Sequence, residues 1–517
     1  MKRIESFLIV CLSVICIGCG QNLTVASPDG SVRFALGVEG GRLNYSIDVD
    51  GKPFILPSAL GLEAKRHPLD KDFKLMGIKH CSASEDWTSP WGENKQHKDV
   101  HNELEATFKN PDGVVLILRA RAFDDGVGFR YEYKVPGDSV KVTDELTEFR
   151  LAQDGTSWSI PANFNTYELE YRTLPIADVD DANTPFTFKT DSGLYGSIHE
   201  AALYDYPEMT LVSFRPGEAG GELSFKADLA PWPDGVKARL PKEFHTPWRV
   251  ILITRDAPGL VNSDLILNLN DPCALDDVSW IHPVKYMGVW WEMITGKSSW
   301  SYTDDYPSVQ LGKTDYSKAK PHGRHGANNE NVRRYIDFAA ENGFDAILIE
   351  GWNEGWEDWY GFQKDFVFDF VTPYPDFDLP ALNAYAHKKG IRLVMHHESS
   401  SSTVNYERWM EQAYTLMNKY GYNAVKSGYV GPIIPFAEHH YSQPIIGHYH
   451  HAILEAAKHH IMVNAHEAVR PTGMCRTWPN MIGNESAMGT EFRAAINPGH
   501  TSILPFTRLQ GGPMDYT

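Results

Sequence analysis

Residues 22–270 alternate apolar and polar positions in short runs that Gly, Asn, Asp and Pro interrupt. Such runs are typical of half-buried strands joined by turns, and little of this region has the 3.6-residue period of an amphipathic helix. The pattern therefore predicts an all-β sandwich domain over residues 22–270. Its clearest strands are Ser31–Leu36, Arg42–Val49, Val114–Ala122, Gly128–Val135 and Glu222–Lys226.

The pattern changes after Asp271–Lys285, a stretch with two prolines and no clear period that we interpret as a linker. Beyond it, short apolar runs alternate with segments of helical period, which predicts βα units and a parallel sheet. The predicted strands are Met287–Trp291, Ala346–Ile349, Arg392–Met395, Ala424–Lys426, Ile461–Val463, Met481–Gly483 and Ser502–Pro505. The predicted helices are Asn331–Asn342, Leu379–Lys389, Tyr406–Tyr420 and Gln443–His459.

Polar residues follow every predicted strand of this second region instead of gathering at one switch point. This distribution favours a (β/α)8 barrel over residues 286–517 rather than a doubly wound sheet, and no Gly-rich phosphate fingerprint follows a strand. Only seven barrel strands are predicted before Thr517. We therefore expect a barrel that is incomplete at its C-terminal end.

The first 21 residues have the features of a targeting segment. Lys2 and Arg3 are basic, Phe7–Ile17 is apolar but too short to span a bilayer, and Cys19 follows. Cleavage before Cys19 would make the chain an acylated bacterial lipoprotein, although Cys16 stands where the usual signal has Leu. We expect an exported protein of the periplasm or outer membrane, with no transmembrane helix.

Composition narrows the possible partners. The formal net charge of −19, from 67 acidic and 48 basic residues, argues against nucleic acid and is compatible with neutral substrates and divalent cations. Aromatic residues reach 12% of the chain, with 14 Trp, as is common in sugar-binding proteins and in large cores. Beyond residue 21, Cys81, Cys273 and Cys475 form neither a disulfide framework nor a zinc motif.

Three carboxylates follow the predicted barrel strands: Glu398, Glu467 and Glu491. Hydrolysis of a glycosidic bond needs one protonated carboxyl group to assist the leaving oxygen and one ionised group. The ionised group either attacks the sugar or activates water. These residues therefore predict a glycoside hydrolase, and their positions in the sequence leave the choice between the two mechanisms open.

A calcium ion is a second use for such a group of carboxylates. Calcium takes 6–8 oxygen ligands, and several carboxylates facing one pocket would repel one another without a cation. The candidate ligands are Glu467, Glu485 and Glu491, joined by Glu200 from the sandwich. The alternative is that some of them form ordinary ion pairs, for example Glu467 with Arg470.

The histidines and tryptophans at strand ends admit two interpretations each. His396 shares a strand face with Glu398, and with His466 it suits hydrogen bonding to hydroxyl groups at least as well as zinc binding, since no HExxH motif is present. No GxSxG motif of a serine hydrolase is present either. The loop tryptophans would stack on sugar rings or pack in the core; they are Trp290, Trp291, Trp352, Trp356 and Trp359.

The residues at these strand ends resemble those of glycoside hydrolase family 97, the family of SusB-type α-glucosidases. Five motifs carry the resemblance, and the last two are long enough to be very specific. They are HHESSS at His396–Ser401, VKSGYVG at Val425–Gly431, EHHY at Glu438–Tyr441, VNAHEAVRPTG at Val463–Gly473 and IGNESAMGTEF at Ile482–Phe492. The resemblance implies an N-terminal β-super-sandwich, a (β/α)8 TIM barrel and a C-terminal β-domain that this chain lacks.

The resemblance also implies a mechanism. Retaining members of the family carry an Asp nucleophile after the fourth strand, where this chain has Lys426-Ser427-Gly428, so it is similar to the inverting branch. Glu491 would then be the general acid, and Glu398 and Glu467 would act as base on the attacking water.

Calcium-site positions and sugar-binding positions also come from the resemblance. They are Glu200, Glu467, Glu485 and Glu491 for Ca²⁺, and His396, Lys426 and His466 for sugar hydroxyls. We expect a calcium-dependent, exo-acting, inverting α-glucosidase on malto-oligosaccharides. The alternatives are an α-galactosidase of the same family and a non-catalytic carbohydrate-binding lipoprotein.

Overall fold

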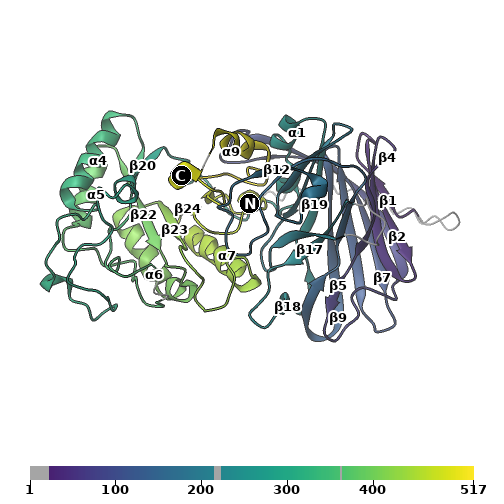
Figure 1. Cartoon of the computed structure of the whole chain (residues 1–517), viewed down its shortest axis with the longest axis horizontal. Coiled ribbons are helices and arrows are strands. Elements are labelled where there is room, and N and C mark those ends of the chain that lie inside the picture. The colour runs from purple at the N-terminus through teal and green to yellow at the C-terminus, as the bar shows by residue number, and fades with distance from the viewer. Residues whose placement is uncertain (1–21, 215–222, 361–363, 496) are drawn as a thin grey trace, which may run out of the picture.

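The computed structural model has two parts that lie side by side, a β-rich N-terminal part and a helix-containing C-terminal part (Figure 1). The structure describes residues 22–214, 223–360, 364–495 and 497–517. The predicted signal segment and Cys19 lie outside the described residues. Within them, no helix is long and apolar enough to cross a membrane.

Two antiparallel sheets make up the N-terminal part. The first has the order β1 (Thr24–Ala26), β2 (Val32–Glu39), β3 (Arg42–Val49), β4 (Lys52–Leu60), β10 (Glu148–Leu151), β17 (Leu223–Leu229), β16 (Met209–Phe214) and β13 (Asp181–Asn183). The second has the order β12 (Arg172–Pro175), β11 (Gly155–Ser159), β14 (Phe186–Thr190), β15 (Tyr195–Ala201), β19 (Trp248–Thr254), β9 (Gly126–Glu145), β8 (Val115–Phe123), β7 (Gln96–Lys109) and β6 (Lys74–Thr88). Two further strands, β5 (Leu62–Ala64) and β18 (Ala238–His245), pair with β9.

Apolar alternation brings the two sheets together. In β3 and β8 every second side chain is buried, as the sequence pattern predicts. Tyr45 of the first sheet lies 4.8 Å from Phe129 of the second, measured between ring centroids, and Phe225 lies 5.0 Å from Phe186. Burying one such ring contributes about 1.5–3 kcal/mol. The predicted sandwich is confirmed.

The C-terminal part contains a parallel sheet with helices between its strands. The strands lie in the order β20 (Tyr286–Val289), β21 (Ala346–Ile349), β22 (Arg392–Glu398), β23 (Ala424–Gly428), β24 (Met462–Ala465) and β25 (Met481–Asn484). The longer helices are α4 (Asn329–Glu341), α5 (Leu379–Lys388), α6 (Thr403–Tyr420) and α7 (Gln443–Lys458). These elements confirm six of the seven predicted strands and all four predicted helices of this part.

Three of the four longer helices begin at a residue whose side chain caps them. The side chains of Asn328, Asp378 and Ser402 accept a hydrogen bond from the first turns of α4, α5 and α6. Gly421 ends α6 with a φ of 73°, a left-handed conformation that costs glycine no steric penalty. The helices bury one apolar face, which in α4 includes Ile336.

The prediction of a seventh strand at Ser502–Pro505 is wrong. The chain there forms α9 (Pro498–Ile503) and the 3₁₀ turn η4 (Leu504–Phe506). Asn497 caps α9 by accepting from the backbone N–H of His500, and Pro498 sits in the first turn, where a missing N–H is harmless. This capping signal outweighs the short apolar run Ile503-Leu504.

Shorter helical turns connect the strands. They are α1 (Ala257–Val261), α2 (Leu265–Asn268), α3 (Trp291–Ile294), α8 (Met474–Thr477), η1 (Ile176–Asp178), η2 (Tyr316–Lys318) and η3 (Thr490–Ala495). The segment Asp271–Lys285, predicted as a linker, has no strand or helix and packs on the C-terminal part. Its Trp280 stacks on His460 at 5.1 Å, and Ile281 is buried.

The parallel sheet is curled. The amide of Asn464, at the end of β24, donates to the hydroxyl of Tyr286 on β20 at 3.1 Å. In a flat sheet, two strands with three others between them would lie about 19 Å apart. The contact therefore shows that the sheet curves back towards β20, as half of a barrel does; the complete (β/α)8 barrel stays a prediction.

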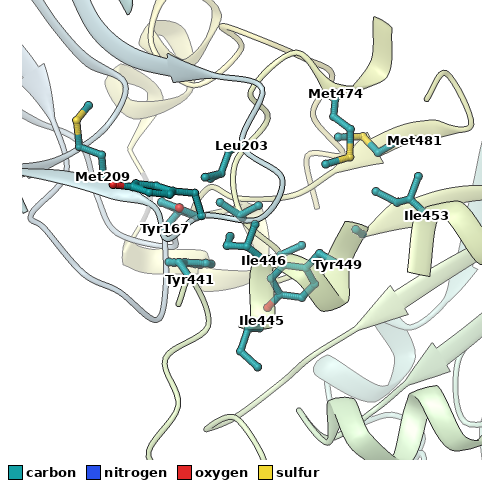
Figure 2. Close-up of a cluster of buried hydrophobic side chains, with 14 of the residues drawn as sticks. Tyr167, Leu203, Met209, Tyr441, Ile445, Ile446, Tyr449, Ile453, Met474 and Met481 are labelled. Atoms are coloured by element: carbon teal, nitrogen blue, oxygen red, sulfur yellow. The ribbon is translucent and has the colours of Figure 1, made fainter. Parts of the chain in front are cut away.

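A shared apolar core joins the two parts (Figure 2). Tyr167, Leu203 and Met209 of the N-terminal part face Tyr441 and residues of α7. The rings of Tyr167 and Tyr441 stack with centroids 4.3 Å apart. Because this contact is buried, the N-terminal part is held against the C-terminal edge of the parallel sheet.

Candidate active site

The ends of neighbouring strands place polar side chains in one row. His396 on β22 pairs in register with Lys426 on β23, and Lys426 pairs with Asn464 on β24. Residues in register on parallel strands point to the same face of the sheet. His397 points to the other face, where its ring accepts or donates a hydrogen bond with the Tyr406 hydroxyl at 3.0 Å. Because side chains alternate along β22, His396 shares its strand face with Glu398, as predicted, and His397 does not.

Glu350, at the end of β21, completes this row as a buried counter-ion. Its carboxylate lies 2.7 Å from the ammonium group of Lys426 and 3.7 Å from Nε2 of His396, and it accepts from the Trp300 indole at 3.1 Å. Burial alone would raise the pKa of Glu350, but the charge of Lys426, together with His396 and the hydrogen bonds from Lys426 and Trp300, outweighs burial and lowers that pKa to about 2. Lys426 therefore stays positively charged inside the site.

His396 is a neutral hydrogen-bonding group. Burial lowers its pKa to about 3, so the ring is uncharged at neutral pH. Trp356 stacks on it with centroids 5.6 Å apart, and the indole of Trp352 donates to its carbonyl oxygen at 2.9 Å. Trp352 and Trp356 are buried and thus fix His396, whereas Trp291 is 45% exposed.

Glu398 ends β22 in a pocket of backbone donors. One of its oxygens accepts from the N–H groups of Ser400 at 2.7 Å and Val430 at 3.2 Å. Burial and the neighbouring charge of Glu467 raise its pKa well above the usual range. Its other oxygen fills the space beside Gly428, where a Cβ atom would lie only 2.2 Å from it.

Four glutamates gather between the sheet edge and the sandwich. Glu168, Glu485 and Glu491 each offer an oxygen within 4.8 Å of the others, and Glu467 joins Glu485 and His466 in a second group of the same size. Burial, and then the charge of Glu485, raise the pKa of Glu168 to about 10 and those of Glu467 and Glu491 to about 7. We refer to these four residues as the acidic cluster.

His466 lies between two carboxylates and carries a positive charge. Its Nδ1 is 3.1 Å from Glu485 and its Nε2 is 2.9 Å from Asp515. Burial lowers its pKa, but these carboxylates outweigh burial and raise it to about 10. Asp515 is fixed in turn by the Tyr286 hydroxyl at 2.7 Å and by Asn464.

The loops that carry these groups contain strained backbone. Ser400, Glu467 and Ser486, each just beyond a strand end, have φ values of 51°, 54° and 42°. A non-glycine residue in this left-handed region costs about 1–3 kcal/mol and persists only where the surroundings hold it. Such strain is common where a side chain must be held at a site of chemistry.

The structure does not bring Glu200 to the acidic cluster, which corrects its prediction as a calcium ligand. Glu200 is fully buried in the sandwich, where its oxygens bind Arg249 at 2.5 Å and Arg470 at 2.7 Å. The residue that the sandwich supplies to the cluster is Glu168. The alternative pairing of Glu467 with Arg470 is also wrong, because Arg470 faces Glu200 and Glu208.

Sequence reasoning missed Glu168, Glu350 and Asp515. Glu350 directly follows a predicted strand, so the signal that selected Glu398 applies to it equally. Glu168 lies in the loop segment Thr166–Glu170 and Asp515 in an irregular stretch near the end of the chain. Their roles depend on tertiary contacts that no local pattern reports.

Comparisons with known protein families agree with this geometry. A family model described as glycosyl-hydrolase 97 N-terminal matches residues 25–272, and one described as glycoside hydrolase 97 matches residues 290–487. The chain belongs to glycoside hydrolase family 97. It is therefore a glycoside hydrolase, and the strand-end carboxylates are its candidate catalytic groups.

Related proteins of the family include both structures and curated sequences. A family 97 enzyme from Pseudoalteromonas sp. strain K8, solved in complex with acarbose and, as a variant, with panose, is 42% identical with a TM-score of 0.87, over 96% of this chain and 74% of that chain. A retaining α-galactosidase from Bacteroides thetaiotaomicron is 24% identical over 558 residues, covering 100% of this chain and 76% of the relative. A probable retaining α-galactosidase from Streptomyces bingchenggensis is 25% identical over 508 residues, covering 96% and 70%.

A substitution at Glu350 tests the buried row in this family 97 site. Glu350→Gln leaves Lys426 buried without a counter-ion, so the free energy of unfolding at pH 7 should fall by about 3–5 kcal/mol. Because the folded pKa of Glu350 is about 2, below its usual 4.5, its stabilising contribution is present above pH 4.5 and is lost as pH falls towards 2. The difference between wild type and variant should therefore shrink over that range in denaturant unfolding. A difference that stays constant down to pH 2 would contradict the assignment.

Proposed function

We propose that this chain is a calcium-dependent, exo-acting, inverting α-glucosidase that acts on α-glucosides such as malto-oligosaccharides. The observation that carries the mechanism is the contact between Gly428 and Glu398. An inverting enzyme activates water with a carboxylate and needs no nucleophile in contact with the sugar, whereas a retaining enzyme does.

The end of β23 carries no nucleophilic carboxylate. Its residues Lys426, Ser427 and Gly428 include none, and the Glu398 carboxylate lies where a side chain at 428 would begin. A Cβ atom at 428 would require the end of the Glu398 side chain to move, so an acidic residue at 428 and Glu398 in its present position compete for the same space. This supports the inverting arrangement, with Glu398 on the water side of the sugar.

The pKa values of the three candidate catalytic glutamates are all raised. Burial and the charge of Glu485 hold the pKa of Glu491 at about 7, which keeps a useful fraction protonated as general acid at neutral pH. Burial and the charge of Glu467 raise the pKa of Glu398, which favours one ionised member of this pair over two. The ionised member of the pair accepts the proton of the attacking water.

The acidic cluster fits a calcium ion. It offers oxygen donors from several carboxylates at one place, the donor type that calcium prefers, and raised pKa values show that their negative charges lack sufficient compensation. Glu168, Glu485 and Glu491 would hold the ion, with Glu467 beside them. When bound, the ion would supply positive charge that orients the catalytic carboxylates and the water.

The substrate class is supported by Lys426 and His396 of the buried row, which can donate to sugar hydroxyls, and by the 42% identical Pseudoalteromonas enzyme, solved with acarbose and, as a variant, with panose. His466, predicted for the same role, has its two ring nitrogens on Glu485 and Asp515. Panose is an oligosaccharide of α-linked glucose, which supports an α-glucoside as the substrate of this chain. The second candidate, an α-galactosidase, is favoured by the names of the curated relatives at 24% and 25% identity.

Product stereochemistry tests the proposal directly. Proton NMR of p-nitrophenyl α-glucoside hydrolysis should show the β-anomer of glucose as the first product, with the α-anomer appearing only by mutarotation. The same assay on p-nitrophenyl α-galactoside separates the two substrate candidates. Initial release of the α-anomer would exclude the inverting mechanism, and no hydrolysis of either substrate would favour a carbohydrate-binding protein.

Replacing the proposed general acid should lower kcat most on substrates whose leaving group needs a proton. Glu491→Gln removes the proton that a sugar leaving group needs, so kcat on maltose should fall by about 10²–10⁴-fold. Activated aryl glucosides with good leaving groups should lose much less. An equal loss on both substrates would remove Glu491 from the role of acid.

Calcium binding should depend on the sandwich as well as on the sheet. Glu168→Gln and Glu485→Gln each remove one carboxylate ligand from the cluster, so the calcium dissociation constant from isothermal titration calorimetry should rise by about tenfold or more. Glu170→Gln is the control, because Glu170 is exposed and contacts Asn497 instead. Equal affinity in Glu168→Gln and the control would place the ion elsewhere.

A further inference from the structure

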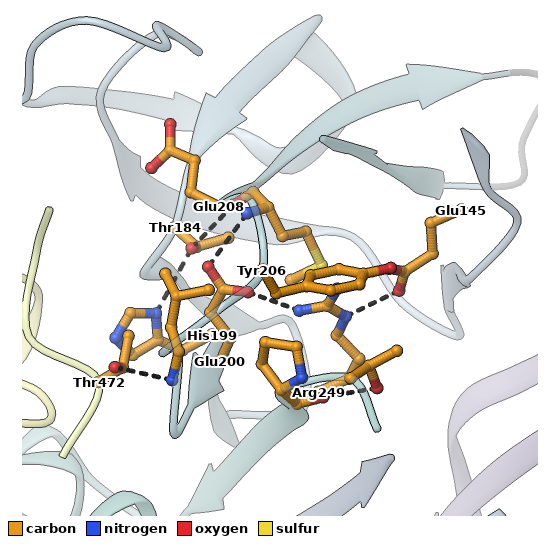
Figure 3. Close-up of polar contacts among 12 residues, drawn as sticks. Glu145, Thr184, His199, Glu200, Tyr206, Glu208, Arg249 and Thr472 are labelled. Atoms are coloured by element: carbon orange, nitrogen blue, oxygen red, sulfur yellow. Dashed lines mark hydrogen bonds and ion pairs between the residues drawn. The ribbon is translucent and has the colours of Figure 1, made fainter. Parts of the chain in front are cut away.

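A buried group of charged residues lies where the sandwich meets the loop after β24 (Figure 3). Arg470, three residues after Glu467, lies 2.7 Å from a Glu200 oxygen and 3.6 Å from Glu208. It also donates to the hydroxyl of Thr184 and, at 3.3 Å, to the carbonyl oxygen of Met209. These partners all belong to the sandwich, so Arg470, which belongs to the C-terminal part, is inserted among sandwich residues.

The group continues into the sandwich through a second arginine (Figure 3). Arg249 on β19 binds the other oxygen of Glu200 at 2.5 Å and both oxygens of Glu145 at 2.6 and 2.7 Å. Glu145, Glu200, Arg249 and Arg470 are at most 1% exposed. The position of Glu200 is thus fixed from the sandwich side, independently of the loop that it holds.

The same group holds the segment that carries Glu168. Tyr167, directly before Glu168, donates its hydroxyl hydrogen to Glu208, and the Arg470 guanidinium lies 5.7 Å from the centroid of its ring. Arg470 is therefore close in sequence to, or in contact with, the segments that carry two members of the acidic cluster. One is Glu467 on its own loop, and the other is Glu168 from the sandwich.

The sandwich also contacts the backbone of this loop, just after Arg470. The N–H of Ala202 donates to the carbonyl oxygen of Thr472 at 2.9 Å, and the ring of His199 contacts the carbonyl oxygen of Pro471 at 3.0 Å. Glu467 itself is held in a left-handed conformation with a φ of 54°. A strained residue of this kind keeps its conformation only while neighbouring contacts enforce it.

Stability alone does not account for buried ion pairs at this interface. The apolar contacts between Tyr167, Tyr441 and α7 already join the two parts, and buried ion pairs contribute little net stability compared with apolar packing of the same volume. An arginine guanidinium adds a defined geometry, because its planar set of N–H donors fixes both the distance and the angle to a carboxylate.

We infer that Arg470 is a positioning residue of the hydrolytic reaction. Its contacts with Glu200, Glu208 and Tyr167 connect it to the sandwich. Through these contacts the sandwich fixes the positions of Glu467 and Glu168 in the acidic cluster. The inference rests on the proposed roles of those two glutamates. The sandwich then acts as part of the active site through a residue that touches neither sugar nor cation.

The test compares Arg470→Lys and Glu200→Gln with Glu145→Gln in the full chain. Lys keeps the charge of Arg470 but loses its planar set of donors, and Gln keeps the shape of Glu200 but loses its charge. Glu145→Gln is a matched control, because it removes an equally buried charge from the same group without touching the β24 loop. Melting temperature, kcat, KM and calcium affinity are measured for each variant on an aryl glycoside that the wild type cleaves.

Arg470→Lys and Glu200→Gln should lower kcat by about tenfold or more, with a smaller change in KM, because a misplaced catalytic carboxylate loses orientation. They should also raise the calcium dissociation constant by about tenfold. Glu145→Gln should lower the melting temperature to a similar extent while kcat and calcium affinity stay close to wild type. If all three variants lose stability alike and show equal kcat, the inference is wrong.

The outcomes separate this inference from the proposed function. If the wild type binds no calcium or releases the retained anomer, the proposed function fails, and the kcat contrast between Arg470→Lys and Glu145→Gln still decides the positioning role. If Arg470→Lys does not fold, Glu200→Gln provides the same contrast, since Arg249 continues to pair with Glu145.

Discussion

Repulsion among buried carboxylates is the constraint on which the rest of this structure depends. The acidic cluster brings four glutamates together at the edge of the curled sheet, with Glu398 nearby. In a low-dielectric interior such charges interact far more strongly than in water, so they have to be neutralised by protons, by cationic side chains or by a metal ion. Lys426 and His466 provide part of this compensation, and the raised pKa values of Glu168, Glu467 and Glu491 show that it is incomplete. A site with this excess of negative charge is suited to holding a cation and a protonated acid at neutral pH.

Both parts of the chain contribute residues that hold this cluster. The parallel sheet lines up Glu350, His396, Lys426 and Asn464 in a row, because neighbouring strands end in register. The sandwich supplies Glu168 and holds the loop after β24 through Arg470. Neither part contains the whole cluster, so the apolar contact between them is a condition for the site as well as for the fold.

The sequence was sufficient for the elements that depend on local patterns. Alternation predicted the sandwich strands, and apolar runs followed by polar residues predicted six strands of the parallel sheet and the face that His396 and Glu398 share. It failed at Ser502–Pro505, where a capped helical turn overrides an apolar run. It also failed where a role depends on a distant partner. Glu200 lies within β15, where two arginines from other elements occupy its oxygens, while Glu168 has no distinguishing neighbours in the sequence.

The contact between Gly428 and Glu398 bears on the chemistry of the site. A side chain at 428 would begin 2.2 Å from an oxygen of Glu398, so a substitution of Gly428 requires the end of the Glu398 side chain to move. Under the proposed mechanism, an acidic residue added at 428 would displace the carboxylate that activates water, so the chemistry at the end of β23 is coupled to the residue at the end of β22.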